Sequence, residues 1–156
     1  MYNHIMVPLD GSELAECVLP HLISVAKGCA VPQVTLVRAV PPLKVYSAEF
    51  EDSVAIPEMQ KIEEQSMANA KDYLDKQAAL LKEKGINASV NVIFGDVLDV
   101  LTEFAEKNKV DLIIIATHGR SGISRWVWGS VADRILRSAR VPVLMVRAPG
   151  SHGRGI

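Results

Sequence analysis

The chain has 156 residues, of which 49% are hydrophobic, and its 17 basic and 18 acidic side chains give a formal net charge of −1. A chain of this length and apolar content can bury one substantial core, which excludes disorder as a description of the whole. The balanced charge gives no electrostatic reason to expect nucleic acid as the main partner. No stretch reaches the roughly 18 to 20 consecutive apolar residues that a membrane-spanning helix needs, so no membrane partner is expected.

The first forty residues predict a strand, a helix and a second strand. The apolar run His4–Leu9 is typical of a strand that ends near Pro8, because proline lacks the amide hydrogen of a strand interior. The following D-G-S-E turns into a helix, which is capped either by Asp10 together with Glu13 or by Ser12 alone. This helix is predicted to run to Cys29, and Gln33–Val40 forms the second strand.

The rest of the chain continues the alternation of strand and helix. The predicted elements are a helix over Glu58–Lys84, a strand over Ala88–Phe94, a helix from Val97 through Ala105, a strand that begins at Leu112, a helix over Ser130–Ala139 and a strand over Pro142–Arg147. Five alternations indicate a three-layer α/β domain with a doubly wound sheet of five parallel strands and helices on both faces. Residues 1–148 are predicted to form this single domain, and residues 149–156, rich in glycine, a flexible tail.

The cysteines and the N-terminus favour the cytoplasm. Cys17 and Cys29 are twelve positions apart on one predicted helix, about 18 Å at helical rise, which is too far for a disulfide. Reduced thiols are the ordinary state in the cytoplasm. The chain enters its first strand without a charged and then apolar leader, so a cytoplasmic location is expected.

The stretch from Leu112 to Val131 carries the main functional signal. A β-branched apolar run is followed by a loop that contains three glycines, by Ser130, and by a helical pattern that begins at Val131. Glycines allow close approach of the backbone, and a helix N-terminus supplies unpaired N–H groups with a partial positive charge. His118, Arg120 and Arg125 add cationic groups. This arrangement predicts a site for the phosphates of a nucleotide.

Other phosphate-binding architectures fit the residues less well. No G-x-G-x-x-G follows the first strand and no G-x4-G-K-[ST] occurs, which disfavours a dinucleotide fold and a P-loop enzyme. A response regulator would need an acidic cluster after the first strand, where Asp10 stands nearly alone. In a parallel sheet, ligands sit beyond the carboxyl ends of the strands where strand order reverses. Pro8–Asp10, Ala39–Val40 and Ala116–Gly119 are therefore expected to meet around one ligand.

Several motifs resemble those of one known family. The G-x2-G-x9-G-[ST] pattern of nucleotide-binding universal stress proteins maps onto Ala116, Gly119, Gly129 and Ser130, with alanine in place of the first glycine. The early V-P-L-D-G-S and the late V-P-V-L-M-V-R are similar to that family as well. The resemblance implies strand order 3-2-1-4-5, ATP in the cleft, Mg²⁺ riding on its phosphates near Asp10, and dimers formed by the last strand. It implies nucleotide contacts at Pro8, Leu9, Asp10, Ala39, Ala116, Gly119, Gly129, Ser130 and Val131. His118 and Arg120 join this set as cationic groups of the same loop.

Each of these assignments has a plainer alternative. Ser130 and Asp133 form an S-x-x-D pattern, so the Ser130 hydroxyl can cap its own helix. Asp10 can be a cap, and His118 can be a solvated loop residue rather than an acid or base. Trp126 and Trp128 fit packing or a subunit interface better than base stacking. The apolar strand Val143–Val146 would promote aggregation if it were an exposed edge of the sheet. Pairing with the same strand of a second copy across a two-fold axis would cover it.

The sequence thus predicts a homodimeric, ATP-binding sensor or regulator linked to stress. Two alternatives remain open. One is a slow ATPase or self-phosphorylating enzyme, for which only Asp10, His118 and Ser130 offer reactive groups. The other is a dimerisation module with an empty cleft, because the methyl group of Ala116 stands where the family pattern has glycine. No protein-only metal site is expected.

Overall fold

A single parallel sheet organises the protein. The computed structural model describes residues 1–43, 55–117 and 128–148. The sheet has five strands in the order β3-β2-β1-β4-β5, and every neighbouring pair is parallel. The strands are β1 (His4–Pro8), β2 (Gln33–Val40), β3 (Ala88–Phe94), β4 (Leu112–Thr117) and β5 (Val143–Arg147). The predicted fold class and strand order are confirmed.

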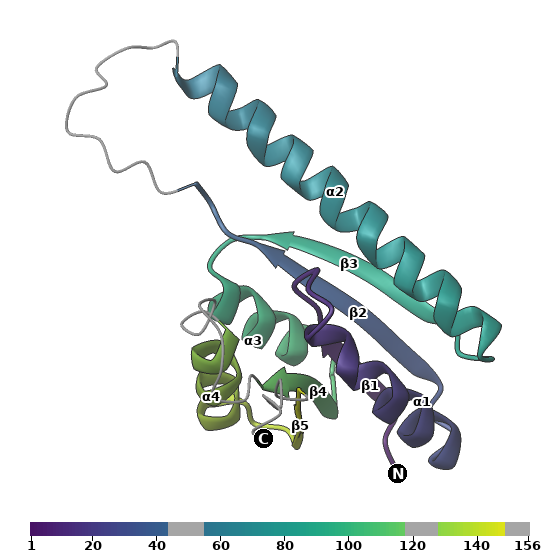
Figure 1. Ribbon diagram of the computed structural model, residues 1–156. Coiled ribbons are helices and arrows are strands. Elements are labelled where there is room, and N and C mark those ends of the chain that lie inside the picture. Colours follow the sequence, from purple (N-terminus) through teal and green to yellow (C-terminus); the bar gives the residue numbers. More distant parts are fainter. Residues whose placement is uncertain (44–54, 118–127, 149–156) are drawn as a thin grey trace, which may run out of the picture.

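Helices cover both faces of this sheet (Figure 1). The helical elements are the 3₁₀ turn η1 (Ala15–Val18), α1 (Leu19–Gly28), α2 (Ala55–Glu83), α3 (Val97–Lys107) and α4 (Trp128–Ser138). Leu22 of α1 and Leu74 of α2 belong to the core on one face, whereas Leu101 of α3 and Ile135 of α4 belong to the core on the other. Among the described helices, none combines the length and apolar character that crossing a bilayer requires.

The central strands owe their composition to burial on both faces. Side chains of a strand alternate between its faces, so Ile5 and Val7 join the core under α1 and α2 while Met6 joins the core under α3 and α4. All five residues of β1 are buried, and β4 is buried from Leu112 to Ala116. A strand covered on both faces reads as a continuous apolar run, which is why these two were recognisable in the sequence.

The first helix differs from its prediction. A single helix was expected from the D-G-S-E turn to Cys29, but a 3₁₀ turn at Ala15–Val18 precedes an α-helix that begins at Leu19. Pro20 is the reason, because a proline ring clashes with the carbonyl four residues earlier inside a helix but fits its first turn. Cys17 and Cys29 are both free, as expected.

Two other helices begin earlier than predicted. Helix α2 starts at Ala55 rather than Glu58, which places Pro57 in the first turn, where its missing N–H has no partner to lose. Helix α4 starts at Trp128 rather than Ser130, so Gly129 and Ser130 lie within its first turn instead of ahead of it. The predicted tail, residues 149–156, lies outside the described residues.

A left-handed residue closes α1 and yields a stability prediction. Ala30 has φ +50°, and the next amide, that of Val31, donates to the Ala26 carbonyl at 2.9 Å. Glycine adopts this conformation without the clash of a Cβ atom, so Ala30→Gly should raise the free energy of unfolding by about 0.5–1 kcal/mol. Urea unfolding followed by circular dichroism measures the change. The reverse exchange, Gly85→Ala at φ +80°, should lower stability; the same sign for both variants would contradict the explanation.

Candidate functional site

The strand order places the candidate site beside β1 and β4. From β1 the chain proceeds outward to β2 and β3, and it then crosses to β4 and β5 on the other side. The carboxyl ends of β1 and β4 therefore flank the point where strand order reverses, which is the usual ligand position in such sheets. Pro8, Ala39 and Ala116, three of the predicted contacts, lie at the ends of β1, β2 and β4 on this edge.

A hydrogen-bonded turn follows β1. The Leu9 amide donates to the Val37 carbonyl at 2.9 Å, which leaves Leu9 fully buried and its N–H already paired. Asp10 Oδ1 accepts from the Ser12 amide at 2.8 Å and from the Ser12 hydroxyl at 2.6 Å. The same hydroxyl oxygen accepts from the Ala15 amide at 3.2 Å. Ser12 thus accepts from the first amide of the 3₁₀ turn, whose N-cap residue is Leu14, and Asp10 holds Ser12 in place.

A polar cluster that sequence reasoning missed lies against this turn. The Arg38 guanidinium stands 5.4 Å from the centroid of the Tyr73 ring, and it is close enough to Gly11 that an added Cβ would come within 2.9 Å of it. The Tyr73 hydroxyl donates to Glu16 Oε1 at 3.0 Å, and Gln77 Nε2 donates to the same oxygen at 3.1 Å. A sequence signal existed, because Arg38 is the one charged residue of β2. The cluster joins α2 to the turn and brings a cation beside the candidate site.

The environment of Tyr73 predicts a response to alkaline pH. Burial, the hydrogen bond to Glu16 and the negative charges of Glu16 and Asp10 raise the pKa of Tyr73 above its ordinary value of 10.0, against the opposing effect of Arg38. When the pH rises above 10.0, the unfolded chain loses the Tyr73 proton while the folded chain still retains it. The free energy of unfolding therefore falls as the pH rises further. Tyr73→Phe should show a shallower alkaline decline in pH-dependent urea unfolding, together with a loss of about 1 kcal/mol at neutral pH from the missing hydrogen bond. Parallel curves for the two proteins would contradict this assignment.

The first turn of α4 supplies candidate donors. Since β4 and β5 are parallel, α4 must run back across the sheet, and its N-terminus lies at the edge that carries the carboxyl ends of the strands. The first four N–H groups of an α-helix have no partner within the helix. Gly129 and Ser130 are the second and third residues of α4 and belong to this group, whereas the intrahelical hydrogen bonds begin with the amide of Val131, the fourth residue. The amides of Gly129 and Ser130, with the positive end of the helix dipole, form an arrangement suited to an anionic group.

Two predicted contacts have side chains that point into the core. Ala116 is 3% exposed and packs in the core under α1 and α2, while Val131 is 6% exposed and packs in the core under α3 and α4. Only their backbone atoms face any ligand at this edge. His118, Gly119 and Arg120, together with Arg125 and Trp126, lie outside the described residues, as do the side chains of Trp128 and Ser130. The S-x-x-D capping alternative for Ser130 therefore stays a prediction.

The carboxylate of Asp10 fits a metal only as one ligand among others. Both hydrogen bonds to this group end on Oδ1, and no described residue bonds Oδ2. In the described ranges, no three His, Cys, Asp or Glu side chains come together as a metal site. A magnesium ion at this place would need phosphate oxygens and water to complete its octahedral shell.

Comparison with known proteins places this geometry in a family. The sequence matches the profile of the Usp group, the universal stress protein family, over residues 1–147. A curated relative, universal stress protein MJ0531 of Methanocaldococcus jannaschii, is 29% identical over 152 residues, which cover 96% of this chain and 84% of the relative. The solved structure of MJ0577 from the same organism has a TM-score of 0.78 at 24% identity and covers 97% of this chain and 99% of its own.

Two other solved structures of the same fold contain nucleotides. One is a universal stress protein in complex with cAMP, with a TM-score of 0.61 at 21% identity, covering 95% of this chain and 98% of that one. The other is an Arabidopsis thaliana universal stress protein family protein with AMP bound, with a TM-score of 0.60 at 14% identity, covering 95% and 93%. At these identities the structures show a shared fold, and the profile match spans nearly the whole sequence. The chain belongs to the universal stress protein family.

Proposed function

We propose that this protein binds ATP, with Mg²⁺ on its phosphates, and acts as a homodimeric regulator of a stress response in the cytoplasm. One observation carries the proposal: the Gly129-Ser130 end of the family motif forms the first turn of α4, at the edge where strand order reverses. Unpaired helix amides at that position hold phosphate in many α/β proteins. The complexes of two related folds with AMP and cAMP support an adenine nucleotide as the ligand.

We assign a role to each predicted contact, and for His118, Gly119 and Arg120, which lie outside the described residues, this role rests on the sequence alone. Asp10 lies on the turn after β1, where its Oδ2 can approach the ribose or the magnesium ion. The backbone near Ala39 borders the adenine, and Pro8 and Leu9 border base and ribose. In this proposal the amides of Gly119, Gly129 and Ser130 hold the phosphates beside the backbone of Val131, and His118 and Arg120 supply positive charge. Nine residues separate Gly119 from Gly129, and the proposed phosphate-binding amides lie on both sides of them. Two groups of donors can bind more than one phosphate group, which favours ATP over AMP.

The burial of Ala116 supports binding rather than an empty cleft. The alternative of a dimerisation module with an empty cleft depends on the Ala116 methyl group obstructing the nucleotide. That methyl group is 3% exposed and packs in the core under α1 and α2. We therefore expect Ala116→Gly to leave nucleotide affinity essentially unchanged.

Calorimetry tests the proposed binding directly. Nucleotide-free protein titrated with MgATP should release heat that saturates at one nucleotide per chain, and mass spectrometry of small molecules released from freshly purified protein should detect an adenine nucleotide.

Asp10→Asn should weaken binding of MgATP more than binding of ATP in EDTA, because only MgATP carries the metal ion that the Asp10 carboxylate would contact. Absence of heat from a folded dimer at high protein concentration would overturn the proposal.

The proposed dimer makes a separate prediction at β5. This strand is at the edge of the sheet, and Leu144 is 36% exposed on it. If β5 pairs with its twin, Leu144→Lys places two charges in the interface and should convert the dimer to monomer in light scattering after gel filtration. Leu80→Lys on α2, at a leucine that is 53% exposed, is the matched control and should stay dimeric. If the Leu144→Lys variant remains dimeric, the dimer interface does not include β5.

A further inference from the structure

A cavity lies between α3 and α4, away from the proposed nucleotide site. Its volume is about 340 Å³, within the range of small-molecule pockets. The lining comes from α3 from Leu101 onward, from the C-terminal end of α4 and the segment after it, from Met6 of β1, and from Val110 just before β4 and Ile113 within it. Because helices and strands run in opposite directions, this cavity is nearer the amino ends of the strands, whereas the candidate phosphate site is beyond their carboxyl ends.

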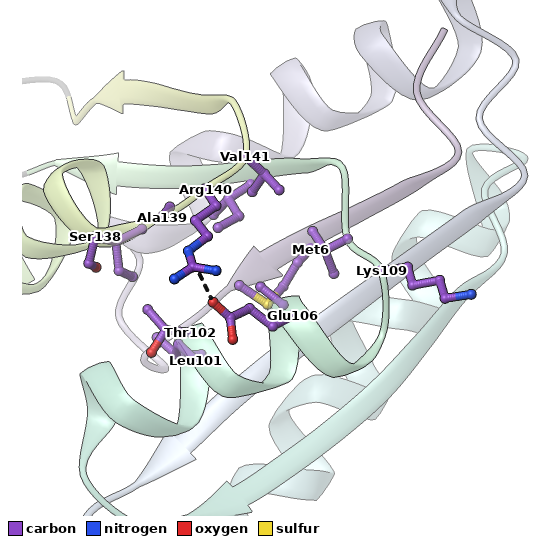
Figure 2. Close-up of a pocket in the computed structure, with 13 residues that line it drawn as sticks. Met6, Leu101, Thr102, Glu106, Lys109, Ser138, Ala139, Arg140 and Val141 are labelled. Carbon is purple, nitrogen blue, oxygen red and sulfur yellow. Dashed lines mark ion pairs between the residues drawn. The ribbon is translucent and has the colours of Figure 1, made fainter.

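The floor of this cavity is apolar and its mouth is charged (Figure 2). Leu101, Ile113 and Ile135 line the cavity and are each 1% exposed, so its deepest lining is apolar. At the mouth Arg140 reaches across from the segment after α4 toward Glu106 on α3, with 3.9 Å between Arg140 Nε and Glu106 Oε1. The cavity therefore has an apolar interior and one ion pair at its entrance.

The ion pair at the mouth is loose. The two side chains are 86% and 64% exposed, and their separation exceeds hydrogen-bonding distance. Exposed pairs of this kind contribute little to stability, so another carboxylate can replace that of Glu106 at low cost. A guanidinium group binds a planar carboxylate through two parallel hydrogen bonds, a geometry that the present contact does not use.

The remaining polar lining favours an anionic ligand held by Arg140. Two cations, Arg140 and Lys109, and one carboxylate line the cavity, and the Lys109 side chain points away from Arg140. The hydroxyls of Thr102 and Ser138 already donate their hydrogens to helix carbonyls, each at 2.8 Å. Among the described lining residues, Arg140 is thus the donor best placed to receive a charged head group.

We propose that this cavity binds a small amphiphilic carboxylate, a short apolar chain that ends in one carboxyl group. The chain would enter between α3 and α4 and contact Leu101, Ile113 and Ile135. The carboxylate would take the two-hydrogen-bond position on Arg140, and Glu106 would turn into solvent. This site is independent of the proposed nucleotide function, since it uses neither the turn after β1 nor the first turn of α4.

Octanoate is the probe that tests the site. Titration of the full chain, followed by methyl NMR, should shift the resonances of Ile113 and Ile135, and octanoate should bind at least fivefold more tightly than octanol or octylammonium. Saturating MgATP should leave octanoate affinity unchanged. Displacement by MgATP would place octanoate in the nucleotide cleft instead and overturn the proposal, as would an equal or higher affinity for octylammonium.

Three variants separate the contributions. Arg140→Gln should remove the preference for octanoate over octanol, and Glu106→Gln should strengthen octanoate binding because the internal competitor is gone. Ala139→Trp, at a half-buried lining residue, should block all binding, with Ala79→Trp on an exposed part of α2 as the matched control. Unchanged octanoate binding in folded Ala139→Trp would overturn the proposal, and unchanged preference in Arg140→Gln would exclude Arg140 as the head-group contact.

Discussion

A Gly129→Trp variant is expected to bind MgATP at least about a hundredfold more weakly than the native protein, a loss of about 2.7 kcal/mol. Gly129 is the second residue of α4, where the proposed phosphate contacts are backbone amides. A phosphate can approach those amides only if no side chain fills the space in front of them, and an indole is the largest obstacle available. Tryptophan has at least the helix propensity of glycine, so the variant should still form α4.

The matched control for this variant is Gly28→Trp. Gly28 is the last residue of α1, and a Cβ atom at that position would meet nothing within 4 Å. An indole there stays in solvent, so the control should keep native affinity in calorimetry and a native circular dichroism spectrum. If Gly129→Trp is folded and binds MgATP with native affinity, the phosphates are not held by the first turn of α4.

A Gly95→Ala variant is expected to lose about 3 kcal/mol of unfolding free energy. Gly95 joins β3 to α3 with φ +147°, and its amide donates to the Val40 carbonyl at 3.0 Å. A Cβ atom at this position would stand 2.6 Å from Val100 Cγ1, closer than real Cβ atoms approach any neighbour. The variant therefore combines an unfavourable backbone conformation with overpacking. Urea unfolding measures the loss.

A double-mutant cycle separates the two effects. Val100→Ala removes the methyl group that the new Cβ would strike, at the cost of some buried contact of its own. In the double variant the steric part of the Gly95→Ala penalty should disappear, while the part that comes from φ should remain, which gives a coupling energy of about 1–2 kcal/mol. Additive losses would show that the contact with Val100 is not the source of the destabilisation.

Much of the fold could be predicted because its signals are local. The runs from Ile5 to Val7 and from Leu112 to Ile115 indicate strands buried on both faces, since no exposed strand would tolerate them. Gly85 closes α2 at φ +80°, and Asp96 caps α3 by accepting from the amides of Leu98 and Asp99. These features depend on neighbours within a few residues, so the order of residues is enough to reveal them.

Two prolines explain two places where the predicted helix boundaries differ from the structure. Pro20 divides the first helix because its ring conflicts with a continuous α-helix, a constraint visible in the sequence but outweighed by the periodic apolar pattern. Pro57 has the opposite effect: the predicted helix begins after it, at Glu58, although proline is well suited to a first helical turn and α2 begins at Ala55.

The amino-acid order alone determined the alternation of strands and helices, the parallel sheet and the position of the glycine motif, because periodicity, turn residues and motif spacing are properties of short segments. The packing of Arg38 against Gly11 and Tyr73, the inward direction of the Ala116 methyl group, and the cavity closed by Arg140 and Glu106 were decided only by the tertiary structure. Each of these joins segments that are distant along the chain. Such contacts depend on the relative placement of whole helices and strands, which the packing of the two cores settles and no local pattern encodes.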